Sequence, residues 1–72
     1  MNDNEMSLLE VLVYRQLCQN RGRWLSDRQL AQQFKGVTAR TIRAHCLRLV
    51  KRGLVDQPKN FPVHRYRLSE AR

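Results

Sequence analysis

Acidic residues are scarce in this sequence. Six Asp and Glu stand against 14 Lys and Arg, which gives a formal net charge of +8 over 72 residues. The shortage is concentrated in the second half, where residues 38–72 hold nine basic and two acidic side chains, whereas residues 1–37 hold five and four. Such an asymmetry predicts a basic face that meets an anionic partner, rather than a general aid to solubility.

Cysteine, histidine and aromatic residues are also few. The two cysteines, Cys18 and Cys46, are far apart, and there is no C-x-x-C pair and only two histidines, which argues against a zinc site. We expect both thiols to be free and packed in the core, as in a reducing cytoplasm. A single disulfide is the alternative, although small secreted scaffolds usually carry more cysteines. The aromatic residues Tyr14, Trp24 and Phe34 are expected in the core.

Several other patterns are missing. No apolar run reaches the roughly 18 residues of a membrane-spanning helix, so a transmembrane span is not expected. The opening MNDNEMSLLE lacks the basic start and the cleavage site of a secretory signal. There is no Ser-His-Asp set, no pair of catalytic carboxylates and no glycine-rich phosphate loop. We therefore expect neither an enzyme nor a cofactor or small-molecule ligand.

Three helix starts are signalled by capping residues. Ser7 is followed three residues later by Glu10, and Ser26 by Gln29, and both spacings are those of a capping box. Thr38 is a third cap without a box partner. Glycines 22, 36 and 53 then supply three helix ends. The helices are therefore expected at 7–20, 26–34 and 38–52.

After Gly53 the pattern changes from helical to alternating. LVDQ and VHRYRL read as two strands joined by the turn PKNFP, with Tyr66 on the packed face of the second strand and Arg65 and Arg67 on the other. The predicted fold class is α+β, with three helices followed by a two-stranded β-hairpin. One domain is expected at 7–68, between a flexible N-terminus at 1–6 and a frayed C-terminus at 69–72.

A short helix, a turn containing glycine and a longer basic helix make a helix-turn-helix pattern. With the hairpin, the chain resembles a winged helix-turn-helix domain. The stretch VTARTIRAHCLRLVKRGLVDQ is similar to the recognition helix and first wing strand of small bacterial regulators of the MarR-like and ArsR-like type. Its size is similar to that of stand-alone regulators from bacteria, phages and plasmids.

This resemblance implies a transcriptional regulator, for example a repressor, that binds double-stranded DNA and is associated with the nucleoid in the cytoplasm. Helix 38–52 would enter the major groove, and the wing at 57–67 would lie on the backbone or in the minor groove. Two alternatives stay open. One is an architectural binder without sequence preference, and the other is a winged helix that binds protein.

The helix at 38–52 has two distinct faces. At 100° per residue, one narrow stripe that we assign to the core holds Ile42, Cys46, Leu49 and Gly53. The opposite face carries Arg40, Ala44, Leu47 and Lys51, and no Asp or Glu occurs between Arg40 and Arg52. A charged outer face alone is typical of any surface helix, but a helix tuned for stability usually also carries Glu–Lys pairs. Their absence favours phosphate as the partner.

The expected DNA contacts follow from position along this helix and the wing. Arg40 and Arg43 are placed to read guanine, while Thr41 and Ala44 are small enough to admit the helix to the groove. Thr38 is expected to bind phosphate beside free backbone N–H groups. The remaining predicted contacts, mainly to the backbone, are Arg48, Lys51, Lys59, Asn60, Arg65 and Arg67.

The first helix is apolar on more than one side. Leu9, Leu12, Val13 and Leu17 are expected in the core. A second set at helical spacing predicts a homodimer through this helix, with two recognition helices on a palindromic site. The alternative is that neighbouring elements of the same chain cover this second set. Its members are Leu8, Val11, Tyr14 and Cys18.

Overall fold

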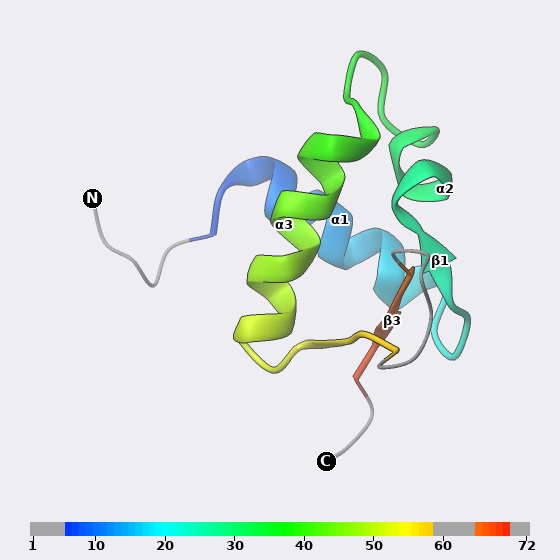
Figure 1. Ribbon diagram of the computed structural model, residues 1–72, viewed down its shortest axis with the longest axis vertical. Coiled ribbons are helices and arrows are strands. Elements are labelled where there is room, and N and C mark those ends of the chain that lie inside the picture. Colours follow the sequence, from blue (N-terminus) through cyan, green and yellow to red (C-terminus); the bar gives the residue numbers. More distant parts are fainter. Residues whose placement is uncertain (1–5, 59–64, 70–72) are drawn as a thin grey trace.

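A computed structural model of the chain describes residues 6–58 and 65–69. Within these ranges the chain forms three helices and three short strands (Figure 1). In chain order they are α1 (Leu8–Gln19), β1 (Leu25–Ser26), α2 (Asp27–Ala31), α3 (Ala39–Lys51), β2 (Val55–Asp56) and β3 (Arg65–Leu68). The predicted α+β class is confirmed, and the arrangement is that of a winged helix-turn-helix domain.

All three predicted helix starts are confirmed. Ser7 accepts a hydrogen bond from the backbone N–H of Glu10, and Thr38 accepts one from Thr41. Ser26 and Gln29 form the complete capping box that the sequence predicts. At the first helix, however, the carboxylate of Glu10 is buried and binds α3 instead of returning to its own cap. The cap survives, because the serine alone satisfies an unpaired N–H.

The second helix is shorter than predicted, ending at Ala31 rather than at residue 34. Beyond it, the N–H groups of Gln33 and Phe34 bond to carbonyls three residues earlier, so the backbone tightens out of α-helical geometry. Gly36 then adopts a φ of +78°, a left-handed conformation that L side chains rarely adopt. The chain can therefore reverse into α3 within a few residues.

The sheet has three antiparallel strands in the order β1-β3-β2. The pairing of β2 with β3, with Val55 opposite Leu68, confirms the two strands of the predicted hairpin. The pairing of β1 with β3, with Leu25 opposite Tyr66, was not predicted. A strand of two residues is too short to show an alternation of apolar and polar residues, and Ser26 is already assigned as a helix cap, so the sequence did not indicate β1. The predicted inward side chain His64 lies outside the described residues.

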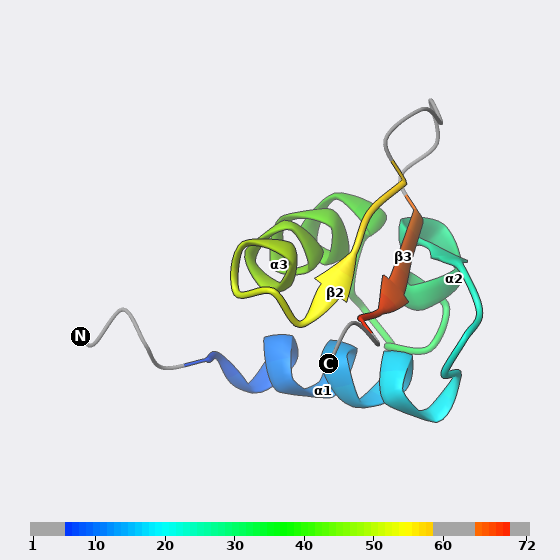
Figure 2. The same ribbon diagram turned by 90° about the horizontal axis from the view of Figure 1, so that it is seen from below.

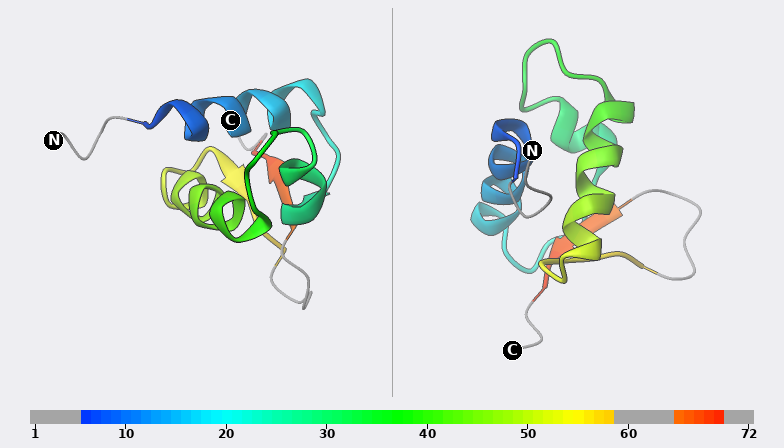
Figure 3. Two further views of the ribbon diagram at one scale, coloured as in Figure 1. Left: turned by 90° about the horizontal axis from the view of Figure 1, so that it is seen from above. Right: turned by 90° about the vertical axis from the view of Figure 1, so that its left-hand side faces the viewer.

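The core lies where α1, α3 and the sheet meet. Figure 2 shows α1 running beneath the strands, and Figure 3 shows α3 beside α1. Tyr66, from β3, is the largest fully buried side chain. Of the predicted core stripe, Ile42, Cys46 and Leu49 are buried, whereas Gly53 lies beyond the end of α3 and is exposed. The buried hydrophobic residues are Val13, Leu17, Leu30, Ile42, Cys46, Leu49, Val55 and Tyr66.

Some predictions about the core were wrong or only partly right. Cys18 is exposed, so the prediction that both thiols pack in the core holds for Cys46 alone. Leu9 and Leu12 are only partly buried, whereas Val13 and Leu17 on the same helix are fully buried. In the described part of the chain, no helix is both long and apolar enough to cross a membrane.

Candidate nucleic-acid interface

The outer face of α3 is an exposed surface that carries basic side chains. In Figure 1, α3 lies in front of α1, so this face points away from the rest of the molecule. Its side chains are all exposed, as their helical spacing predicts: Arg40, Ala44, Leu47 and Lys51. Within the described residues, neither Arg40 nor Lys51 forms an ion pair, so both charges are available to an outside anion.

The first turn of α3 presents hydrogen-bonding groups beside these cations. The hydroxyl oxygen of Thr38 accepts the N–H of Thr41 at 3.2 Å, and the two threonine hydroxyls lie 3.1 Å apart. Both side chains are exposed. A helix start with free N–H groups and adjacent hydroxyls can bind an anionic oxygen, and the phosphate contact of Thr38 stays a prediction.

Arg43 sits at the edge of this face and is held by a carboxylate from α2. The Oδ2 atom of Asp27 accepts hydrogen bonds from Nε of Arg43 at 3.2 Å and from Nη2 at 3.0 Å. The Asp27 side chain is buried, whereas that of Arg43 is 43% exposed. The arginine predicted to read bases is therefore engaged on one edge by a carboxylate of the same chain.

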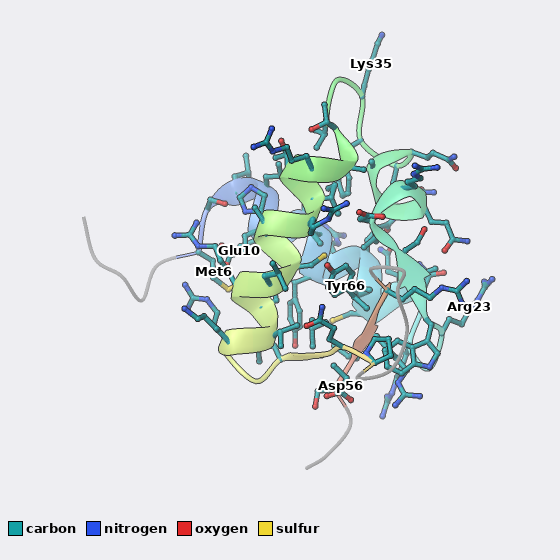
Figure 4. The ribbon with its side chains drawn as sticks, in the orientation of Figure 1. Met6, Glu10, Arg23, Lys35, Asp56 and Tyr66 are labelled. Atoms are coloured by element: carbon teal, nitrogen blue, oxygen red, sulfur yellow. The ribbon has the colours of Figure 1, made fainter. Side chains whose placement is uncertain are left out.

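On the other edge of α3, three basic side chains lie near a second buried carboxylate. Oε2 of Glu10 lies 3.0 Å from Nε of Arg52, while Oε1 lies 3.8 Å from both Arg48 and His45. Figure 4 labels Glu10 beside α3. The inference that the cations of this helix have no acidic partners was therefore wrong. The helix itself contains none, but α1 and α2 supply one carboxylate to each flank.

The wing residues are divided between solvent and internal contacts. Arg65 is exposed. The guanidinium carbon of Arg67 instead lies 4.3 Å from the ring centre of Trp24, and Nη2 lies 3.9 Å from the Asp56 carboxylate. Cation–π contact thus fixes Arg67 against the body of the domain. The predicted contacts Lys59 and Asn60 lie outside the described residues.

Beneath α3, a buried hydroxyl and a buried thiol stay protonated. Burial, with smaller contributions from Cys46 and Asp27, raises the pKa of Tyr66 from 10.0 to about 12 against the opposing effect of Arg43. Burial, aided by Asp27, raises the pKa of the Cys46 thiol from 9.0 to about 12. Neither group can act as a nucleophile or base near neutral pH. They belong to the core and not to a reactive site.

A polar pocket of about 280 Å³ lies between α1 and α2, away from these groups. No His, Cys, Asp or Glu lines it, and amides predominate: its residues are Gln16, Asn20, Arg23, Leu25, Gln29, Leu30, Gln32 and Gln33. The side-chain amides of Gln16 and Gln33 bond to each other at 2.9 Å. Among the described residues no cluster of His, Cys, Asp or Glu could hold a metal ion. The lining of this pocket therefore offers no carboxylate, imidazole or thiol for acid–base or nucleophilic chemistry.

Two residues of this interface were missed in the sequence, Asp27 and Glu10. Leu47 is 41% exposed in the middle of the basic face, where helical spacing placed it, although it was not predicted as a DNA contact. Asp27 and Glu10 were missed because each has a local explanation: an acidic residue in the first turn of a helix reads as a partner for the helix dipole or the cap. Only the packing of the three helices shows which cations they meet.

No protein-family model and no curated protein sequence matches the chain. Among solved structures, a chain from a study of HOP2 superposes with a TM-score of 0.69 at 14% sequence identity, covering 83% of this chain and 97% of that one. That study concerns the DNA recognition and protein interaction domains of HOP2 and its homologous DNA pairing properties. At this identity the likeness establishes a shared fold.

Proposed function

We propose that this protein binds double-stranded DNA, with α3 in the major groove and the wing against the backbone or the minor groove. The observation that carries the proposal is the outer face of α3, where Arg40 and Lys51 are exposed and unpaired within the described residues. Ala44 between them is small enough for close approach to base edges. The net charge of +8 and the fold shared with the HOP2 chain support the same partner.

We further propose that the binding is sequence-specific and serves transcriptional regulation, for example repression, as in the MarR-like and ArsR-like regulators that the sequence resembles. Arg40 and Arg43 are the proposed base-reading residues, with Thr38, Thr41, Arg48 and Arg65 on phosphates. In this role the protein would be associated with the nucleoid in the cytoplasm.

The exposed apolar side chains of α1 support a homodimer as part of this proposal. Leu8 is 76% exposed and Val11 is 42% exposed, and Cys18 is exposed on the same helix. Tyr14 is partly buried against the core and contributes only an edge. A dimer would place two copies of α3 on half-sites roughly 34–36 Å apart. Sedimentation that finds only monomer at high protein concentration would count against this arrangement.

The test of DNA binding is a titration of labelled duplex with the protein and with matched charge variants. Arg40→Ala should weaken binding about tenfold or more, because a contact to a base or a phosphate is lost. Arg15→Ala removes the same charge from the exposed surface of α1 and should change affinity little. Because Arg15 lies between Val11 and Cys18 on the proposed dimer face, sedimentation checks that the oligomeric state of this variant is unchanged. Equal effects of both variants would show that only net charge matters.

Two rival functions give different results in the same assay. An architectural binder predicts that Arg43→Ala weakens binding to every duplex alike, whereas specific readout predicts a larger loss on one preferred sequence. A protein-interaction module predicts no measurable affinity for DNA, or an affinity that changes little with salt. The exposed Leu8 and the protein interaction domains studied in HOP2 give this second rival its support.

A further inference from the structure

We propose that Asp27 is a positioning residue for DNA recognition, which holds Arg43 so that its free edge reads a guanine next to a thymine. The proposal rests on the proposed function and adds to it a specificity-determining residue and the base step that is read. Asp27 itself touches no DNA in this scheme. It acts through the conformation of Arg43.

The carboxylate of Asp27 is fixed by bonds on both oxygens. Oδ1 accepts the backbone N–H of Arg28 at 2.8 Å, and Oδ2 accepts two donors of Arg43. The side chain is 8% exposed and stands at the first residue of α2. Because one oxygen is tied to the helix backbone, the other is presented to α3 in a single orientation.

The guanidinium of Arg43 keeps donors for a second partner. It carries five N–H groups, and Asp27 engages one on Nε and one on Nη2. Both donors of Nη1 and the second donor of Nη2 stay free, and they form the edge that can bond simultaneously to O6 and N7 of guanine. An arginine already held in one rotamer loses less conformational freedom on binding. The pair is thus preorganised for a planar, bidentate acceptor.

Position along α3 favours Arg43 over the cations on the other flank. It lies in the N-terminal half of the helix, the part that reaches base edges in a helix-turn-helix. Arg52, the main partner of Glu10, follows the last residue of α3 and is mostly covered. The Asp27 pair is therefore placed for readout, and the Glu10 cluster for attachment of α3 to α1.

Leu47 supplies the neighbouring contact. It lies four residues after Arg43 on the same side of the helix, and it remains exposed among basic residues. An apolar side chain beside a guanine-reading arginine suits the methyl group of thymine in the major groove. We therefore expect the preferred site to contain a guanine with an adjacent thymine contacted by Leu47.

The experiment begins by selecting a preferred duplex from a random pool with the unaltered protein. Affinity is then measured for that duplex, for one with the selected G·C pair exchanged, and for one carrying 7-deazaguanine, which lacks the N7 acceptor. The unaltered protein should lose about tenfold or more on both altered duplexes. Arg43→Ala should lose this discrimination and bind all three alike.

Asp27→Asn tests the positioning role. Its discrimination between the three duplexes should fall to that of Arg43→Ala, while its affinity for random DNA stays the same or rises. The double variant should discriminate no worse than Arg43→Ala alone, since Asp27 acts only through Arg43. Asp56→Asn, which removes an equal charge from β2 next to Arg67, is the matched control and should keep full discrimination.

Folding is checked by thermal unfolding of each variant. If Asp27→Asn does not fold, Asp27→Ser retains an acceptor for the Arg28 N–H, and the comparison of Arg43→Ala with unaltered protein on 7-deazaguanine needs no change at Asp27. A folded Asp27 variant with full guanine discrimination overturns the inference, and so does an Arg43→Ala protein that still senses N7. If the protein binds DNA but neither Arg43 nor Asp27 affects guanine discrimination, the role of Asp27 is refuted and DNA binding still holds. If the protein binds no duplex at all, both the role of Asp27 and the proposed DNA binding are refuted.

Discussion

Cys18 and Cys46 carry the same side chain in opposite surroundings. Cys18 is exposed on α1, whereas Cys46 is fully buried and its pKa is raised to about 12. Because the thiolate is the reactive form, iodoacetamide at pH 8 should label Cys18 within minutes and leave Cys46 unlabelled in the folded protein. Mass spectrometry of the intact chain, before and after denaturation, checks this.

The control for this labelling is Cys18→Ser, which should remove modification of the native protein without loss of stability. Rapid labelling of Cys46 in folded Cys18→Ser protein would contradict the burial of this thiol beneath α3. It would mean that the core opens at this helix on the timescale of the reaction.

Tyr66 makes the stability of the fold sensitive to alkali. Its folded pKa of about 12 exceeds the ordinary value of 10.0, so the folded state keeps a proton that the unfolded chain loses first. The stabilising contribution is complete below pH 10 and is lost as pH rises toward 12, with Cys46 adding a similar loss above pH 9. Denaturant unfolding should therefore give a lower free energy of unfolding at pH 11 than at pH 8.

Tyr66→Phe distinguishes the contribution of the Tyr66 hydroxyl to this alkaline loss of stability from that of the Cys46 thiol. Its hydroxyl is buried without a hydrogen-bond partner among the described residues, so removing it should change stability at pH 7 by about 1 kcal/mol or less. The variant should also lose stability less steeply between pH 10 and 12. An alkaline slope identical to that of the unaltered protein would assign the effect to other residues.

At the scale of the helices, Glu10 attaches α3 to α1. Its carboxylate is buried and bonds to Arg52 at 3.0 Å, with Arg48 and His45 nearby. Glu10→Gln removes the buried charge but leaves Arg52 and Arg48 in place, so we expect a loss of about 1–3 kcal/mol in the free energy of unfolding. Denaturant unfolding at neutral pH measures it.

Asp56→Asn is the matched comparison, because its ion pair with Arg67 is long, at 3.9 Å, and partly exposed. Exposed pairs contribute about 0–1 kcal/mol, so this variant should be nearly as stable as the unaltered protein. A Glu10 variant that is equally stable would mean that apolar packing alone fixes α3 on α1.

The elements differ in how far the sequence predicts them. The starts of α1, α2 and α3 are predictable because each depends on a cap and residues within one turn of it. The early end of α2 is not, since the tightening after Ala31 leaves no distinct residue signal. Strand β1 exists only because β3 lies beside it, and such a pairing involves residues about 40 positions apart along the chain.

At the scale of the whole molecule, the proposed interface joins charges from α3 and β3 into one surface. Affinity for duplex DNA should therefore fall linearly on a plot of log K against log salt concentration. Lys51→Ala should reduce the slope by about one unit if Lys51 binds a phosphate, and should weaken preferred and random sequences alike. Titrations at several salt concentrations measure the slope.

Arg15→Ala should leave that slope unchanged, because Arg15 lies on the exposed surface of α1. If Lys51→Ala and Arg15→Ala change the slope equally, the salt dependence arises from the net charge of the protein and not from phosphate contacts of α3.

The outer face of the candidate site was predictable, but its internal partners were not. Helical spacing alone places Arg40, Ala44 and Lys51 on one side of α3. The carboxylates that hold Arg43 and Arg52 come from α2 and α1, over 16 and 42 residues of sequence. Which carboxylate pairs with which arginine depends on how the three helices pack, and this cannot be inferred from the sequence of one helix.

The last strand of the chain is the middle strand of the sheet. Tyr66 enters the core from β3, between β1 and β2, which both precede it in the sequence. During synthesis, the residues of the three helices are therefore made before the residue that completes their core. A nascent chain truncated before β3 should stay loosely packed and open to proteases, and the basic face of α3 should acquire its fixed geometry only in the final step of folding.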